Sequence, residues 1–267
     1  MSRDIVAGQV LADDVPGWPP SVEDFYLPSL LQNAYPWVTK FTLLIWLAVA
    51  VVIIFFLLSY RRPRLVPGRA QWMAESLYSV GRDNVAGEVI GHEGLRFGPY
   101  LATLFVFILV GNLFSIVPLI QVSPNAHIAF PAVLAVISYV LFNYLGIRKH
   151  GLWNYLRMNL FLPGVPWPMY VLLVPIEFFS TFILRPFTLA VRLFANMFAG
   201  HVILLVFTLG GFVLLGAQSP VIRSISVLSW AMAIGLTFFE IMVAALQAYV
   251  FALLTASYVS GALADEH

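Results

Sequence analysis

Long uncharged apolar runs constrain this chain most, because each is long enough to cross a lipid bilayer. The first, 41–60, holds 20 residues without a charge. As an α-helix it would be about 30 Å long, which matches the hydrocarbon core of a bilayer. Further runs cover 98–120, 128–147, 168–215 and 220–262. The sequence therefore predicts an all-α integral membrane protein with about five membrane helices.

The composition also indicates a membrane protein. The chain is 61% hydrophobic and only 10% charged, whereas soluble domains carry about 25% charged residues. Its mean hydropathy is +0.90. The sequence contains no cysteine, which excludes disulfides, thiolate metal sites and a cysteine nucleophile. We expect no cofactor, no metal site and no nucleic-acid partner.

Cations beside the apolar runs predict the orientation of the chain. Only Lys40 immediately precedes the first run, whereas three arginines follow it at 61–64. The positive-inside rule then places the N-terminal segment 1–40 outside the cell and the C-terminus in the cytoplasm. We expect a multi-pass protein of the bacterial plasma (inner) membrane, with 41–267 as a single membrane domain.

Residues 69–92 differ from the apolar runs around them. They mix apolar residues such as Trp72 and Leu77 with charged residues such as Arg82 and Glu88. This pattern predicts an amphipathic helix that lies at the membrane interface. A solvated helix within a loop is the alternative.

The last two apolar runs are unusually long. As one helix, 168–215 would reach about 72 Å, which is more than twice the thickness of the bilayer core. It either splits into two spans near Arg185 and Pro186 or runs as one strongly tilted helix. Because 220–262 is also long, we favour a hairpin of two strongly tilted helices.

Ionisable residues inside the last two runs need an explanation, because each costs at least about 2.5–3.5 kcal/mol at membrane depth. They are Glu177, Arg185, Arg192, His201 and Glu240. In a helix, Arg192 shares a face with Arg185 and Asn196, whereas His201 points to the opposite side. A second polar face, on 220–262, carries Glu240, Gln247 and Tyr258.

Arg192 cannot carry protons, because a guanidinium stays charged in proteins. Glu177, the nearest acid of the same run, would lie about 22 Å away along the helix. The counter-charge is therefore either Glu240 or a carboxylate from another chain. His201 is a proton carrier or a hydrogen-bonded packing residue, and Glu240 is a candidate proton relay. Arg185 is a candidate for an arginine whose guanidinium reaches the membrane interface.

Small residues recur along both long runs, and small side chains at such positions let another helix approach closely in lipid. They are Ala195, Ala199 and Gly200 on 168–215, and Ala244, Ala248, Ala252 and Ala256 on 220–262. Packing within the chain and a smooth surface for a moving partner are both open interpretations.

Three segments combine into a specific signature. Residues 185–201 read RPFTLAVRLFANMFAGH, and residues 246–255 read LQAYVFALLT, with Tyr258 after them. A weaker segment is GNL at 111–113, with Pro118 after it, and the chain ends in DEH. Together these segments resemble subunit a of the F-type ATP synthases, over residues 41–267.

The resemblance implies a proton-translocating stator subunit that is not an enzyme by itself. Its partners would be a rotating ring of c subunits, b-type peripheral stalk subunits, the rest of the ATP synthase and membrane lipid. The two long tilted helices would curve along the ring. Two offset half-channels would couple proton flow to rotation.

The resemblance also implies roles for individual residues. Arg192 would face the ring carboxylate and separate the half-channels, with Asn196 and Gln247 assisting near it. His201 and Glu240 would lie in the outer half-channel. Further candidate lining residues are Asn112, Glu177, Arg185 and Tyr258.

The chain departs from the family pattern at two places. Some relatives have an acid at the position of His201 and a histidine at that of Glu240, so the pair is exchanged here and suggests one titratable unit. In the predicted external turn, Asn125 and His127 stand where many relatives have an acid and an amide.

Two other functions fit the sequence less well. A stand-alone secondary transporter of protons or cations would usually need intramembrane acids at the midplane and repeated broken helices. The predicted spans contain no aspartate, and we find no clear internal repeat. An intramembrane hydrolase would need a serine–histidine or metal grouping, and no HExxH or GxSxG motif is present.

Overall fold

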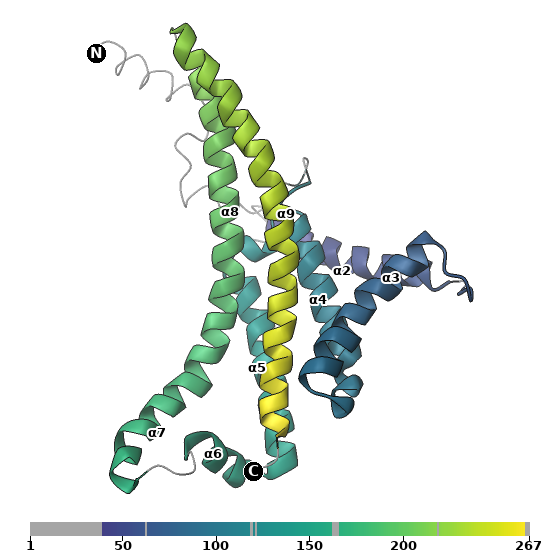
Figure 1. The fold of residues 1–267 in the computed structure, drawn as a ribbon, viewed down its shortest axis with the longest axis vertical. Helices are drawn as coiled ribbons and strands as arrows, with labels where there is room; N and C mark the ends of the chain where they lie inside the picture. Colours follow the sequence, from purple (N-terminus) through teal and green to yellow (C-terminus); the bar gives the residue numbers. More distant parts are fainter. Residues whose placement is uncertain are drawn as a thin grey trace, which may run out of the picture. The chain divides into compact units, whose positions relative to one another are not determined.

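The structure is a computed structural model that describes residues 39–61, 63–117, 120, 122–161, 166–217 and 219–264 (Figure 1). Within these ranges every regular element is a helix. The predicted extracytoplasmic segment, apart from its last two residues, lies outside the described residues. So do Pro118 and the C-terminal motif at 265–267.

The described residues contain five stretches that are long and apolar enough to cross a membrane, which confirms the predicted all-α membrane fold. The longer helices are α2 (Lys40–Ser59), α4 (Gly98–Leu113), α5 (Ala129–His150), α8 (Arg185–Leu215) and α9 (Pro220–Leu263). The shorter helices are α3 (Arg69–Ser79), α6 (Leu152–Leu160) and α7 (Tyr170–Phe179). The 3-10 and π-helical segments are η2 (Val80–Gly87), η3 (His92–Phe97), η4 (Pro124–Ala126), η5 (Trp167–Met169) and η6 (Ser180–Leu184).

The stretch Trp167–Leu215 is continuously helical and does not split at Pro186. Proline lacks an N–H, and in an α-helix its ring collides with the carbonyl four residues earlier. The π-helical segment η6 ends at Leu184, directly before Arg185 and Pro186. Its wider turn displaces the carbonyls that Pro186 would otherwise meet. This local change of helix type explains how one helical path passes the proline.

Helix α4 ends at Leu113, earlier than the boundary of 120 that hydropathy favours. The Ser115 N–H and the Ile116 N–H donate to carbonyls only three residues back, over 3.2 and 3.1 Å. The Ser115 hydroxyl also donates to the Asn112 carbonyl over 2.8 Å. These tight turns end the α-helix, although the sequence after it remains apolar.

The chain divides into two compact units, each assembled from three separate stretches. Unit 1 comprises Met1–Leu47, Gly111–His127 and Ala195–Leu246. Unit 2 comprises Ala48–Val110, Ile128–Phe194 and Gln247–His267. Each long helix therefore contributes one part to each unit.

In unit 1, the end of α8 and the start of α9 form a hairpin in which the two helices lie side by side (Figure 1). The Ser229 hydroxyl donates to the Phe207 carbonyl over 2.6 Å, and the Trp230 indole N–H donates to the Thr208 carbonyl over 3.4 Å. A Cβ atom at Gly211 would lie 2.3 Å from Trp230 Nε1. The glycine therefore makes the room that the indole ring occupies.

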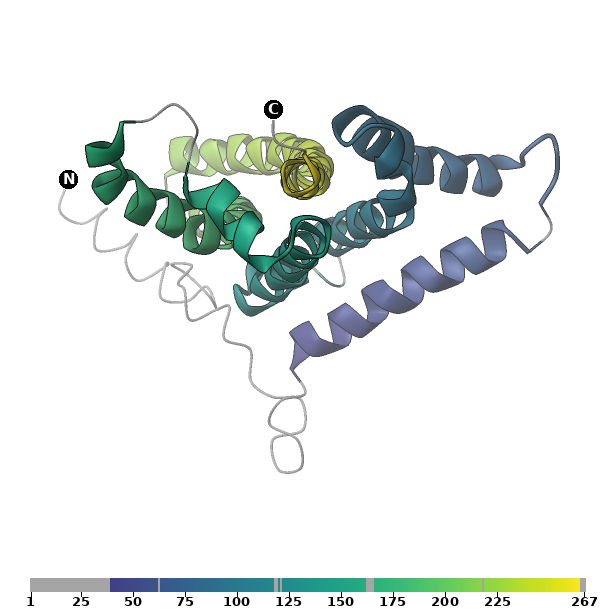
Figure 2. The same ribbon diagram turned by 90° about the horizontal axis from the view of Figure 1, so that it is seen from below.

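Unit 2 has an apolar core in which α4, α5 and the end of α9 meet (Figure 2). Its fully buried side chains include Leu101, Ile108, Leu193 and Phe251. Three alanines of the stripe on α9 belong to this core: Ala248, Ala252 and Ala256. The fourth, Ala244, packs in unit 1 with Ala126 and Met197. The stripe on α9 is therefore packing within the chain, and the interpretation as a smooth partner surface was wrong for it.

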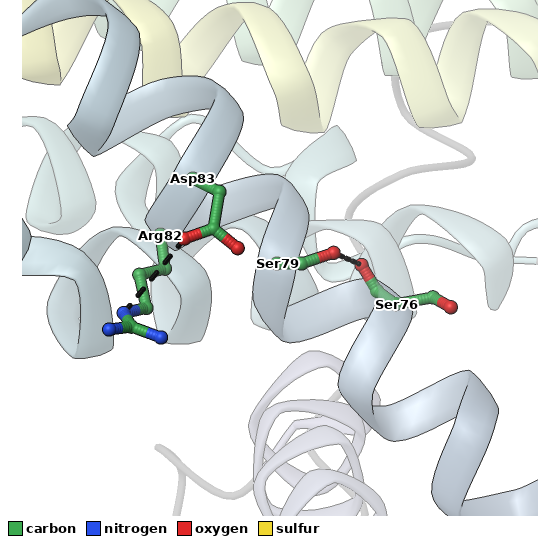
Figure 3. A network of polar contacts seen from close by, with 4 residues as sticks. All are labelled: Ser76, Ser79, Arg82 and Asp83. Atoms are coloured by element: carbon green, nitrogen blue, oxygen red, sulfur yellow. Dashed lines mark hydrogen bonds and ion pairs between the residues drawn. The ribbon is translucent and has the colours of Figure 1, made fainter.

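The predicted amphipathic segment forms α3 and η2. Val85 is fully buried in the core of unit 2, and Leu77 and Val80 pack against that core. A Cβ atom at Gly81 would lie 2.3 Å from the Ala102 Cα atom, so this glycine permits close contact with α4. The polar side is exposed: Arg82 and Asp83 form an ion pair at 3.9 Å beside the Ser79–Ser76 hydrogen bond (Figure 3). Such an exposed pair adds little stability.

Candidate functional site

A buried pair of asparagines forms the centre of a polar cluster in unit 1. Asn112, in the last turn of α4, is fully buried and donates through Nδ2 to the Ala244 carbonyl on α9 over 3.2 Å. Asn125, in η4, is equally buried and donates through Nδ2 to Oδ1 of Asn112 over 2.6 Å. Two amides thus link three elements through hydrogen bonds inside an apolar protein.

The loop after α4 positions Asn125 through local capping. The Ser123 hydroxyl accepts a hydrogen bond from the Asn125 N–H over 3.1 Å, and Pro124 occupies the first position of the turn. Both features are typical of a helical N-terminus. Ser123 also donates to the Gly111 carbonyl over 3.0 Å, which ties the loop back onto α4. A Cβ atom at Gly111 would lie 3.4 Å from Asn125 Nδ2, so the glycine allows the amide to approach.

Glu240 is a buried acidic residue of unit 1, only 4% exposed. Neither of its oxygens has a hydrogen-bond partner among the described residues. Ser115 lies near the carboxyl group, but its hydroxyl proton is donated to the Asn112 carbonyl. A buried carboxylate without partners is costly. The burial of this carboxyl group therefore needs an explanation beyond packing.

A glycine on α8 lies beside the carboxyl group of Glu240. A Cβ atom at Gly200 would meet Glu240 Oε1 at 3.5 Å, which is ordinary van der Waals contact. His201, the next residue, is half-buried on α8. The structure thus brings Glu240 next to the helical turn that carries His201, within unit 1.

Arg192 lies on an exposed face of α8. It makes no hydrogen bond or ion pair with any residue that the structure describes. Ala195, Asn196 and Ala199 are exposed as well. The described part of the chain therefore leaves the Arg192 charge uncompensated.

The other predicted site residues have different surroundings. In unit 2 the Arg185 guanidinium lies over the Tyr258 ring, 5.6 Å from its centroid, and Tyr258 in turn contacts the ring of Phe142. Arg185 is therefore held by a cation–π contact. Gln247 is buried on α9, and Glu177 is half-buried on α7.

Sequence reasoning did not single out Ser115 and Ser123, and it assigned no role to Asn125. The sequence does contain a signal for Ser123 and Asn125, because Ser-Pro-Asn is a pattern that caps a helical turn. No local signal indicated Ser115. Its importance follows only from the way α4 ends.

Comparisons with known proteins show the family of this chain. The model of the family described as ATP synthase A chain matches residues 42–260, which is most of the chain. The chain belongs to the ATP synthase subunit a family. A relative with the name ATP synthase subunit a from Rhodococcus erythropolis is 47% identical over 254 residues, which cover 93% of this chain and 91% of the relative.

Two further relatives with the same name support this membership. The protein from a Nocardioides species is 41% identical over 259 residues, which cover 93% of this chain and 94% of the relative. The protein from Streptomyces lividans is 41% identical over 226 residues, which cover 84% and 79%. Membership of this family makes the chain a multi-pass membrane subunit of ATP synthase, with a role in proton transport and ATP synthesis.

Proposed function

We propose that this chain is the stator wall against which a ring of c subunits turns, and that two offset half-channels lead protons to and from that ring. The observation that carries the proposal is the exposed Arg192 guanidinium, which no described residue neutralises. An arginine at membrane depth costs at least about 2.5–3.5 kcal/mol. A carboxylate on the moving ring would supply the missing counter-charge.

The surroundings of Arg192 support a close and mobile partner. Ala195 and Ala199 are exposed on the same helix, and small residues let helices approach closely in lipid. Asn196 adds a hydrogen-bonding amide one turn after Arg192. We assign Asn196 and Gln247 to supporting roles near the guanidinium.

The proposed mechanism is electrostatic. A ring carboxyl group can cross lipid when it is protonated and neutral, but not cheaply when it is ionised. Near Arg192 the ionised form is favoured, so the proton leaves. The guanidinium itself cannot pass a proton on, which keeps the two half-channels separate. The membrane potential supplies about 2.3 kcal/mol per charge per 100 mV to bias the direction of rotation.

The polar cluster of unit 1 supports a path on the outer side. Neither oxygen of the buried Glu240 has a hydrogen-bond partner among the described residues, and Gly200 lies beside its carboxyl group. We assign Glu240 and His201 to proton relay. We assign the Asn112–Asn125 pair, joined over 2.6 Å, to the polar lining.

The proposed assembly follows from the family and the cation pattern. We propose that b-type peripheral stalk subunits hold this chain against the ring. The cations Arg148 and Lys149 at the end of α5 favour the cytoplasmic side for that end. This orientation places the N-terminus outside and the C-terminus in the cytoplasm of a bacterial plasma membrane.

The decisive experiment is Arg192→Ala in the reconstituted ATP synthase. We expect the complex to assemble and ATP-driven proton pumping into vesicles to be lost, measured with a pH-sensitive dye. Arg223→Ala is the matched control, because the Arg223 side chain is exposed and its Nε donates to the Ala217 carbonyl in the α8–α9 turn. Normal coupled pumping in Arg192→Ala would refute the proposal. Proton flux through the purified lone chain would instead support a secondary transporter.

A further inference from the structure

A pocket with three cations in its wall lies in unit 2, where α5 and α9 end. The cavity has a volume of about 510 Å³ and is lined by Arg96, Phe97, Leu145, Arg148, Lys149 and Leu263. These residues come from η3, from the last turns of α5 and from the C-terminal turn of α9. Stretches far apart in the sequence thus gather positive charge around one cavity.

Specific contacts hold the cations around the cavity. The Arg96 guanidinium lies 4.7 Å from the centroid of the Phe97 ring. The Lys149 ammonium donates to the Leu263 carbonyl, which ties the end of α5 to the end of α9. Arg148 is adjacent and exposed. The charge cluster is therefore built into the fold and does not depend on a loose loop.

Two of these cations, Arg96 and Arg148, have no counter-charge in the part of the chain that the structure describes. No carboxylate in the described ranges forms an ion pair with either of them. Two guanidinium groups around one cavity repel one another, and a bound anion would be attracted to both. Guanidinium groups match the geometry of phosphate oxygens especially well.

The rest of the pocket wall is apolar and points to an amphipathic ligand. Phe97, Leu145 and Leu263 supply that part of the lining. The pocket also lies where two helices long enough to span a membrane end, which is the depth of lipid headgroups. A free phosphate ion or an acidic peptide would use the cations but would leave the apolar wall uncovered.

We propose that this pocket binds the phosphate headgroup of an anionic membrane lipid. Arg96, Arg148 and Lys149 contact the phosphate oxygens, and an acyl chain leaves along Phe97 and Leu145. Basic pockets between membrane helices suit such headgroups. The proposal does not depend on the roles assigned to Arg192 or Glu240.

The test uses the whole ATP synthase in lipid nanodiscs with a photoreactive phosphatidylglycerol. We expect it to label this subunit at the pocket, and a photoreactive phosphatidylcholine to label it far less. Each cation near a lipid surface contributes enough that the double variant Arg96→Gln and Arg148→Gln should lower labelling by about tenfold or more. The variant Arg96→Lys and Arg148→Lys keeps the charge and should retain most of the labelling.

The matched control is Arg61→Gln with Arg64→Gln, which removes two exposed cations beside another membrane helix. We expect this control to label like the unchanged complex. Equal labelling in the Arg96 and Arg148 double variant would overturn the proposal. So would displacement of the probe by millimolar inorganic phosphate, which would identify a free phosphate site. A severalfold rise in labelling after deletion of 265–267 would also overturn it, by identifying the chain's own acidic end as the occupant.

Discussion

The small residues of α8 and α9 look alike in the sequence but have opposite surroundings in the structure. Ala195 and Ala199 on α8 are exposed, whereas Ala248 and Ala252 on α9 are fully buried in the core of unit 2. Small residues permit close approach of a helix, but they do not say whether that helix belongs to the same chain. The stripe on α9 serves internal packing, whereas the stripe on α8 is exposed and is the surface that we propose for a partner.

The polar residues near the two stripes also differ in whether they have partners within the chain. Beside the exposed stripe, Arg192 has no counter-charge among the described residues. Beside the buried stripe, Asn112 reaches the backbone carbonyl of Ala244, and the small side chain of Ala244 leaves that carbonyl accessible. The Asn112 amide thus has a hydrogen-bond partner within the chain, whereas the Arg192 guanidinium has no counter-charge among the described residues.

The largest effect should come from overfilling the buried stripe. In Ala252→Leu, extra carbon atoms enter a close-packed core and cost about 1–3 kcal/mol or more. We expect the amount of this subunit in the membrane to fall by about tenfold, since 1.4 kcal/mol is a factor of ten. Quantitative immunoblotting of membranes measures it. Ala199→Leu makes the same change on the exposed stripe and should leave the amount unchanged; equal losses would erase the distinction between the stripes.

The rate of proton pumping, in contrast to the amount of the subunit, should be sensitive to a change on the exposed stripe. We expect Ala199→Leu to assemble normally but to lower ATP-driven proton pumping by about fivefold, because a larger side chain keeps a partner helix at a distance. Dye quenching in inverted vesicles measures this rate. Val206→Leu, a smaller change at an exposed position of the same helix, is the control. Pumping at the normal rate in Ala199→Leu would mean that no close partner faces this stripe.

The substitution Glu240→Gln tests whether the polar cluster takes part in proton transfer. The amide keeps the size of the side chain but cannot take up or release a proton, so we expect pumping to slow by at least about threefold, because one proton-transfer group is lost. Glu88→Gln makes the same change at an exposed site outside the spans and should have no effect. An unchanged rate in Glu240→Gln would leave this residue with a structural role only.

The smallest effect should come from Asn125→Ala. It removes the donor to Asn112 Oδ1 and leaves a buried acceptor unpaired, at a cost of about 1–3 kcal/mol in stability. We expect the complex to lose activity sooner on heating and pumping to fall by about twofold. Asn143→Ala, which breaks a hydrogen bond with Tyr155 in unit 2, should lower heat resistance without changing the pumping rate at low temperature. Identical pumping in the two variants would remove Asn125 from the path.

Much of the fold could be predicted because the hydropathy of a segment depends only on its own residues. A run of 20 uncharged apolar residues, such as 41–60, can hardly be anything but a membrane helix. Helical periodicity correctly put Arg192 and Asn196 on one face, which the structure leaves exposed. It also put Glu240 and Gln247 on one face, and both are buried.

The amino-acid sequence by itself determined that this is an all-α membrane protein, which residues interrupt its apolar helices and which family it belongs to. The tertiary structure alone decided which alanines are buried, where α4 ends and how Asn125 pairs with Asn112. Asn112 and Ala244 are 132 positions apart, and neither carries a local sign of the other. The reason is physical: periodicity sorts the faces of a single helix, whereas burial depends on which distant helix packs against each face.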